Sequence, residues 1–129
     1  MSKKISEFYI EELSDWIKSI GSYIDEISTL EQRLEDVIAR NTVVDIAAKV
    51  EVHQMMLDNV SNKINELKQE YLIQKNELFV NDNPVADDKI TQEIELKMKL
   101  NALKFSQIEK EFIDIKYYCI SFLIEVLKK

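Results

Sequence analysis

The chain has 129 residues, of which 46% are hydrophobic and 32% charged, and its formal net charge at neutral pH is −7. This length suits one domain and is too short for two domains with separate cores. The acidic balance disfavours nucleic acid and anionic membrane surfaces as partners, because both repel a negatively charged protein. A single glycine and a single proline leave little room for turns, which argues against a many-stranded β architecture.

The N-terminal region and the cysteine content indicate a cytoplasmic protein. Acidic residues from Glu7 onward interrupt the apolar core that a secretory signal needs. The most apolar stretch, residues 117–127, contains Ser121 and Glu125 and is about half as long as the ~20 residues of a membrane span. Cys119 is the only cysteine, so no intrachain disulfide forms, as is usual in a reducing compartment.

The first predicted helix covers about residues 5–40. Its apolar residues alternate four and three apart without a miss, which keeps one stripe of the helix facing a partner. The stripe consists of Tyr9, Leu13, Trp16, Ile20, Tyr23, Ile27, Leu30, Leu34 and Val37. A break is predicted near Asn41, since Thr42 and Asp45 have capping-box spacing and the apolar rhythm changes phase there.

The second predicted helix covers about residues 43–79 with the same four-three spacing. Its stripe consists of Val43, Ile46, Val50, His53, Leu57, Val60, Ile64, Leu67, Tyr71, Gln74 and Leu78. The connection over residues 80–88 holds the only proline, and no strand is predicted in it. The third helix is expected to begin with Asn83 as its cap and Pro84 as its first residue, or with Asp87 as its cap.

The third predicted helix covers about residues 84–128. Its main stripe consists of Ile94, Met98, Asn101, Phe105, Ile108, Phe112, Ile115, Cys119, Phe122 and Val126. Three helices of matching length with short connections predict a single all-α domain over residues 1–129, an up-down-up antiparallel bundle. The alternative is an extended helical hairpin that completes its core by dimerising. The residues expected in the core are Trp16, Ile27, Leu57, Ile64, Leu67, Ile108 and Phe112.

Three polar residues interrupt the apolar stripes. Folding the helices back on one another places Tyr9 at the height of Gln74 and Trp16 at the height of Asn101, which predicts a hydrogen bond within each pair. Asn101 is expected within hydrogen-bonding reach of Trp16 or of another polar residue of the stripes. Such buried pairs often fix the register of a helical bundle, and we favour that role over ligand binding. His53 is interpreted as a buried imidazole bonded to a tyrosine hydroxyl of the third helix, with a ligand contact or a pH-sensitive role as the alternative.

No catalytic, cofactor or metal site is predicted. Zinc sites need more than one histidine and one cysteine. Di-iron bundle sites use Glu-x-x-His pairs, whereas Val50 stands three residues before His53. A lone glycine cannot form a glycine-rich phosphate loop. Cys119 is interpreted as a small apolar residue of the core. The acidic residues of the connection near Asp87 are interpreted as helix caps.

The third helix has more apolar residues than one stripe can hold, and the second helix offers matching ones. Contiguous exposed apolar surface usually marks an interface. The alternative is a skewed bundle, or a third helix that shifts phase, in which both of its stripes pack against the other two helices. The predicted interface residues are Leu96, Leu100, Leu103, Ile113, Tyr117, Ile120, Ile124 and Leu127 on the third helix and Val52 and Met55 on the second. The sequence therefore favours a non-catalytic interaction module that forms a homodimer or binds a helical protein. A carrier of an apolar small molecule is the alternative, and an enzyme is disfavoured.

Overall fold

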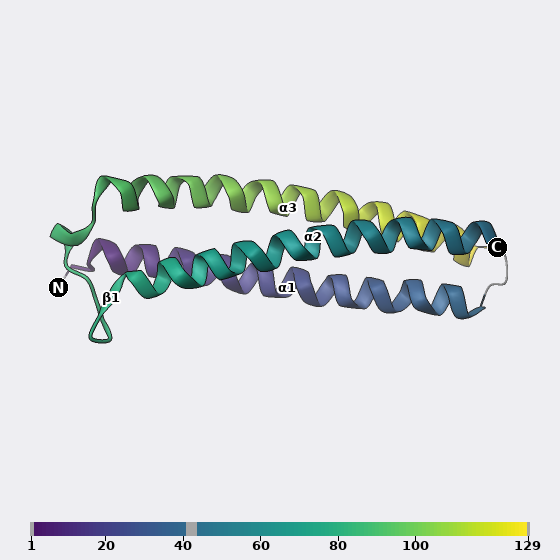
Figure 1. The fold of residues 1–129 in the computed structure, drawn as a ribbon, viewed down its shortest axis with the longest axis horizontal. Helices are drawn as coiled ribbons and strands as arrows, with labels where there is room; N and C mark the ends of the chain where they lie inside the picture. The colour runs from purple at the N-terminus through teal and green to yellow at the C-terminus, as the bar shows by residue number, and fades with distance from the viewer. Residues whose placement is uncertain (1, 41–43, 129) are drawn as a thin grey trace.

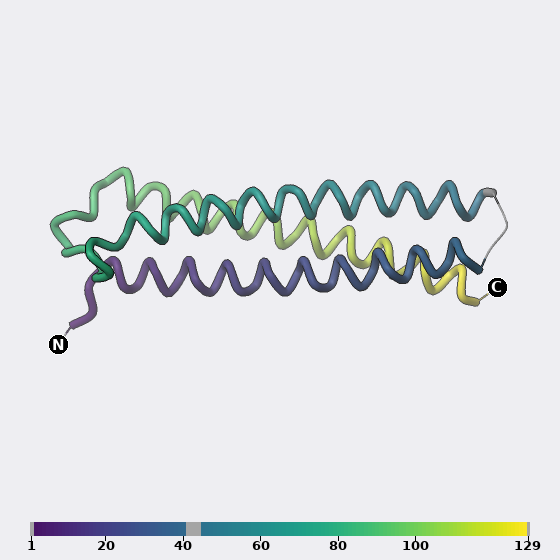
Figure 2. Tube along the Cα trace, turned by 60° about the horizontal axis from the view of Figure 1, so that its bottom comes forward, coloured from purple at the N-terminus to yellow at the C-terminus, as the bar shows by residue number. Residues whose placement is uncertain are grey.

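The computed structural model describes residues 2–40 and 44–128 of the chain. Three long helices, α1 (Ile5–Arg40), α2 (Val44–Glu77) and α3 (Gln92–Leu127), run up, down and up along one elongated bundle (Figures 1 and 2). Each helix packs against the other two, so the predicted all-α bundle is confirmed and the incomplete helical hairpin is wrong. The predicted cap at Asn41 and Thr42 lies outside the described residues.

The core forms where the three predicted stripes meet along the bundle axis. Leu57 and Ile64 are fully buried, and Phe112 is 2% exposed. Ile27, Leu67 and Ile108 are buried as well, as predicted.

Trp16 is the exception among the predicted core residues, because its side chain is only partly buried. Its ring centroid lies 5.4 Å from that of Tyr71 on α2 and 6.1 Å from that of Phe105 on α3. The indole thus packs on aromatic rings of both other helices, and a ring of this size is seldom covered completely.

A short β-hairpin follows α2, so the prediction that this connection contains no strand is wrong. Strand β1 (Phe79–Val80) pairs antiparallel with β2 (Asn83–Pro84). The two residues between the strands have positive φ angles, 52° at Asn81 and 64° at Asp82. Two-residue hairpin loops favour this backbone conformation, and Asn and Asp tolerate it better than most residues. Asn83, one of the two residues predicted to cap the third helix, therefore lies in β2 instead.

The start of α3 also differs from the prediction, which placed it at Pro84 or just after Asp87. A 3-10 turn, η1 (Asp87–Lys89), comes first, and α3 begins only at Gln92. Its cap is Thr91, whose Oγ1 accepts a hydrogen bond of 3.2 Å from the backbone N–H of Ile94. The delay arises because Val85 is buried and its N–H donates to the Leu78 carbonyl at 2.9 Å.

Residues that follow the hairpin close this end of the bundle against the start of α1. The Asp87 carboxylate accepts a hydrogen bond of 2.9 Å from the Ile5 N–H. The buried Ser6 hydroxyl donates to the Val85 carbonyl at 2.7 Å. Asp87 therefore does cap a helix, but that helix is α1 and not α3.

Candidate interaction surface

The outward side of α3 carries large apolar side chains along most of its length. Their exposed fractions run from 41% at Ile113 to 69% at Leu127. The exposed set is Leu96, Leu100, Leu103, Ile113, Tyr117, Tyr118, Ile124 and Leu127. Ile120 was expected to project to solvent with them, but it is half-buried because it packs against the core.

This surface arises because α3 carries two apolar stripes on different sides. Adjacent residues of a helix point about 100° apart, so they lie on different sides. Buried Phe112 is accordingly followed by exposed Ile113, and buried Cys119 by half-buried Ile120. The inner stripe, which we define as Met98, Asn101, Ile108, Phe112, Cys119 and Phe122, is buried throughout. The outer stripe, which we define as Ile113, Tyr117, Ile120, Ile124 and Leu127, repeats the four-three spacing on another side.

The two interface residues predicted on α2 are also exposed, Val52 by 51% and Met55 by 69%. Val52 lines a shallow hollow between α2 and α3 together with Tyr118. Ile120 and Ile124 line a different hollow, between α3 and α1. The structure therefore places Val52 on the opposite flank of α3 from these members of the outer stripe.

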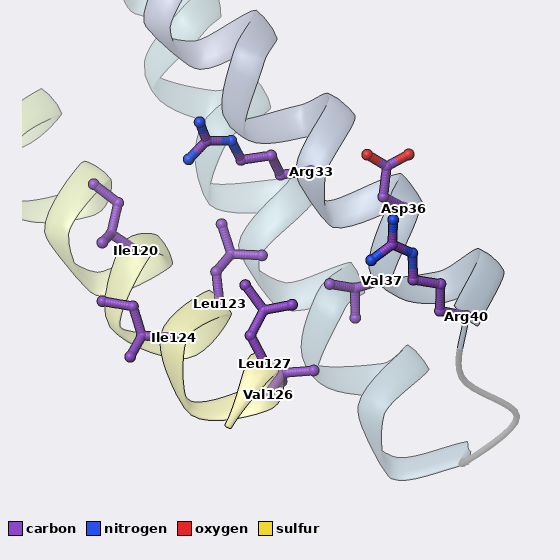
Figure 3. Close-up of a pocket in the computed structure, with 9 residues that line it drawn as sticks. All are labelled: Arg33, Asp36, Val37, Arg40, Ile120, Leu123, Ile124, Val126 and Leu127. Carbon is purple, nitrogen blue, oxygen red and sulfur yellow. The ribbon is translucent and has the colours of Figure 1, made fainter. Parts of the chain in front are cut away.

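An apolar groove of about 390 Å³ lies between the C-terminal halves of α1 and α3 (Figure 3). Its apolar lining consists of Val37, Ile120, Leu123, Ile124, Val126 and Leu127. Arg33, Asp36 and Arg40 of α1 form its polar rim. Ligand-binding clefts usually have volumes of roughly 300–1,000 Å³, so this groove is large enough to hold part of a partner.

The rim of this groove contains both arginines of the chain, Arg33 and Arg40. They continue a series of charged positions spaced by seven residues that begins at Glu26. The Glu26 carboxylate forms an ion pair of 2.7 Å with the Lys116 ammonium of α3. Seven residues beyond Lys116 stands Leu123, which lines the groove together with Arg33. Among the described residues neither guanidinium forms an ion pair.

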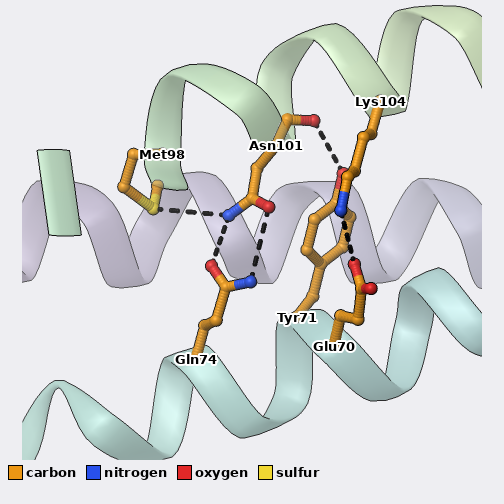
Figure 4. Close-up of polar contacts among 6 residues, drawn as sticks. All are labelled: Glu70, Tyr71, Gln74, Met98, Asn101 and Lys104. Carbon is orange, nitrogen blue, oxygen red and sulfur yellow. Dashed lines mark hydrogen bonds and ion pairs between the residues drawn. The ribbon is translucent and has the colours of Figure 1, made fainter. Parts of the chain in front are cut away.

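A polar layer interrupts the core between α2 and α3 (Figure 4). The Asn101 side chain is 2% exposed and exchanges two hydrogen bonds with the Gln74 amide. The Tyr71 hydroxyl donates to the Asn101 carbonyl at 2.8 Å. Two amides that satisfy each other specify one alignment of α2 against α3, because a slipped register would leave both unpaired.

Asn101 lies within hydrogen-bonding reach of another polar residue of the stripes, Gln74, as one form of the prediction had it, but the two specific pairs predicted do not form. Asn101 bonds to Gln74, not to Trp16, and Gln74 does not bond to Tyr9. Folding one helix back on another about the loop between them shows which residues lie at the same height along the bundle. It does not show which neighbouring helix each side chain faces. The Trp16 ring packs on Tyr71 and Phe105. The Asn101 amide instead bonds to Gln74 of α2.

His53 meets α3 through ring packing. Its imidazole is 5% exposed, and its centroid lies 4.7 Å from the Tyr118 ring and 4.6 Å from the Phe122 ring. Burial lowers the pKa of His53, which favours the neutral imidazole. The expected bond to a tyrosine hydroxyl does not occur among the described residues, so His53 acts as an aromatic core residue at this position.

Little in the described part of the chain supports reaction chemistry. Cys119 is fully buried, and burial raises the pKa of its thiol to about 11, which suppresses the reactive thiolate. No group of three or more potential metal-ligating side chains occurs among residues 2–40 and 44–128. Within the same residues no helix has the length and apolar character needed to cross a membrane.

Comparisons with protein-family models, with curated proteins and with solved structures find no match to this chain. No relative therefore supplies a function by analogy. The functional argument depends on the outer stripe of α3 and on the groove beside it.

Proposed function

We propose that this protein is a non-catalytic helical interaction module that self-associates through the outer stripe of α3. The observation that carries the proposal is the exposure of this stripe in the single chain. Tyr117 is 60% exposed, Ile124 49% and Leu127 69%, and they recur at the spacing of a helix–helix contact. Isolated exposed apolar residues are ordinary on protein surfaces, whereas a continuous stripe supports an interface.

A rough free-energy comparison supports pairing of two copies. Burying a large apolar side chain completely is worth about 1.5–3 kcal/mol. Tyr117, Ile120, Ile124 and Leu127 are already partly covered, so about 1 kcal/mol each remains to be gained. Twofold symmetry doubles the four contributions to about 8 kcal/mol, against an association cost that starts at about 4 kcal/mol. The difference of about 4 kcal/mol corresponds to a dissociation constant of about 1 mM. Ile113, the fifth residue of the outer stripe, adds about 2 kcal/mol on the same reckoning, which brings the dissociation constant to tens of micromolar.

Two further expectations accompany this proposal. A cytoplasmic location agrees with the single buried thiol of Cys119, which needs no oxidising compartment. A role as carrier of an apolar small molecule is the second candidate, and the apolar groove between α1 and α3 is the observation that favours it. The outer stripe is longer than the groove, because it extends back to Ile113 and Tyr117. For that reason we prefer a helix as the occupant.

Size-exclusion chromatography with light scattering tests the proposal. The wild-type chain should run as a dimer at tens of micromolar, and Ile120→Glu together with Ile124→Glu should run as a folded monomer, because the introduced carboxylates cannot be buried unpaired. Ile73→Glu is the matched control: it changes a residue that is 59% exposed on α2 and outside the predicted interface, and it should remain dimeric. A wild-type chain that stays monomeric at this concentration contradicts self-association.

A further inference from the structure

From Glu26 onward, charged residues stand at every seventh position along the side of α1 that faces α3, and only the first of them forms an ion pair among the described residues. At Glu26 and Lys116 the two helices are joined by an ion pair of 2.7 Å. One heptad later Arg33 shares the groove with Leu123, and two heptads later Arg40 lies at the last turn of α1. Both arginines are exposed, and neither has a carboxylate partner among the described residues.

The rim also carries one acid, Asp36, which leaves the rim one net positive charge and forms no ion pair with either arginine among the described residues. Asp36 lies between the arginines in sequence, and its carboxylate accepts a hydrogen bond of 3.4 Å from the Gln32 amide. Figure 3 shows Arg33 extending from α1 toward the side of the groove that α3 lines, and Arg40 turned back along α1 beside Asp36. The groove thus combines an apolar floor with two guanidinium groups along one edge.

We propose that this groove binds an amphipathic helix of a partner protein, one whose apolar stripe is flanked by carboxylates seven residues apart. The seven-residue separation of Arg33 and Arg40 is about 10 Å along α1. Two acidic residues seven apart on a helix lying beside α1 match that separation. Arginine suits this task because its planar guanidinium binds a carboxylate through two parallel hydrogen bonds.

A helix fits these observations better than a small amphiphile. A single-tailed carboxylate needs one cation and leaves the second arginine without a partner. The groove floor spans Ile120 to Leu127, two helical turns, and apolar anchors at such intervals are the usual signature of a helix bound in a groove. This inference rests on the proposed function in that both assign the exposed apolar residues of α3 to contact with a helix. Ile120, Ile124 and Leu127 line the groove and also belong to the outer stripe, so the partner helix and a second copy of the chain compete for one surface, and the partner binds the monomer.

Two designed peptides test the inference on the full chain by fluorescence anisotropy. Both are 21-residue helices with leucine at the stripe positions, and they carry either glutamate or lysine at the flanking positions spaced by seven. The glutamate peptide should bind roughly tenfold more tightly, a preference that two rim ion pairs supply and that salt weakens. The variant Arg33→Gln with Arg40→Gln should lose the preference.

The matched control removes two positive charges elsewhere: Lys18→Gln with Lys99→Gln changes exposed lysines in the half of the bundle that carries the hairpin, and the preference should persist. Equal binding of both peptides to the wild-type chain overturns the proposal. Arginine-dependent binding of dodecanoate without binding of the glutamate peptide overturns it as well, and assigns the groove to a small amphiphile. Because Arg33→Gln with Arg40→Gln leaves the outer stripe intact, its dimerisation reports separately on the proposed function.

Discussion

The inner and outer stripes of α3 have similar apolar composition and opposite surroundings. Phe112 of the inner stripe is 2% exposed, and the residue beside it, Ile113 of the outer stripe, is 41% exposed. The inner stripe contacts α1 and α2 and includes the Asn101–Gln74 pair, which fixes its alignment. The outer stripe lacks such a partner within the described chain. Similar residues thus serve folding on one side of the helix and, in our account, association on the other.

The largest expected effect is a difference in folding stability between alanine variants of two isoleucines five residues apart, Ile108 and Ile113. Ile108→Ala should lower the free energy of unfolding by roughly 2–5 kcal/mol, because Ile108 is 7% exposed and its truncation leaves a cavity. Ile113→Ala should change the stability of the monomer by no more than about 0.5 kcal/mol. Urea denaturation at low protein concentration measures both, and equal losses would show that the two stripes are not distinct.

Removing the Asn101 side chain from the polar layer should lower the stability of the fold by an intermediate amount. Asn101→Ala should cost about 1–3 kcal/mol, because the Gln74 amide loses its partner inside the bundle. Replacing both residues by leucine should recover most of that loss, since no unpaired amide remains. Thermal unfolding of the single and double variants checks this. A double variant as unstable as Asn101→Ala would mean that packing, not pairing, makes the asparagine important.

A smaller effect concerns pH. Partial burial raises the pKa of Glu31 to about 7, with further contributions from a hydrogen bond to Asp58 and from the charges of Asp58 and Glu35. The folded chain therefore holds this proton more tightly than the unfolded chain, whose glutamate titrates near 4.5. The resulting stabilisation is complete below about pH 4.5 and is lost as the pH rises through about 7.

Glu31→Gln should accordingly flatten the fall in stability between about pH 5 and pH 7, while dimerisation stays as in the wild type. Chemical denaturation across this pH range is the measurement. Glu66→Gln, which changes an exposed carboxyl of α2, is the control and should keep the wild-type slope. An unchanged slope in the Glu31 variant would assign the pH dependence to other groups.

The sequence specified the helices and the inner stripe well because a period of four and three directly reports which side of a helix is apolar. It did not specify which partner each side chain meets. Asn101 was expected to reach Trp16 or another polar residue of the stripes; its amide reaches Gln74, and the choice between them depends on how the Trp16 ring packs. Periodicity carries no information on that rotation, which arises only when three helices are packed together.

The connection after α2 could not be predicted for a different reason. Asn81 and Asp82 are suited to a helix cap and to a tight turn alike, since both uses need a short polar side chain. Burial of Val85 and its hydrogen bond to Leu78 decide in favour of the hairpin, and these are tertiary contacts. The groove rim, in contrast, left a signal: the only two arginines of the chain stand seven residues apart beside the apolar stripe of α1.

The most direct test of the account is sedimentation equilibrium of Ile108→Ala and Ile113→Ala under conditions where both variants are folded. We expect Ile113→Ala to weaken the dimer severalfold while leaving folding intact. We expect Ile108→Ala to dimerise as the wild-type chain does despite its lower stability. The opposite pattern, or a dimer that neither change weakens, would contradict the division of α3 into a folding side and an association side.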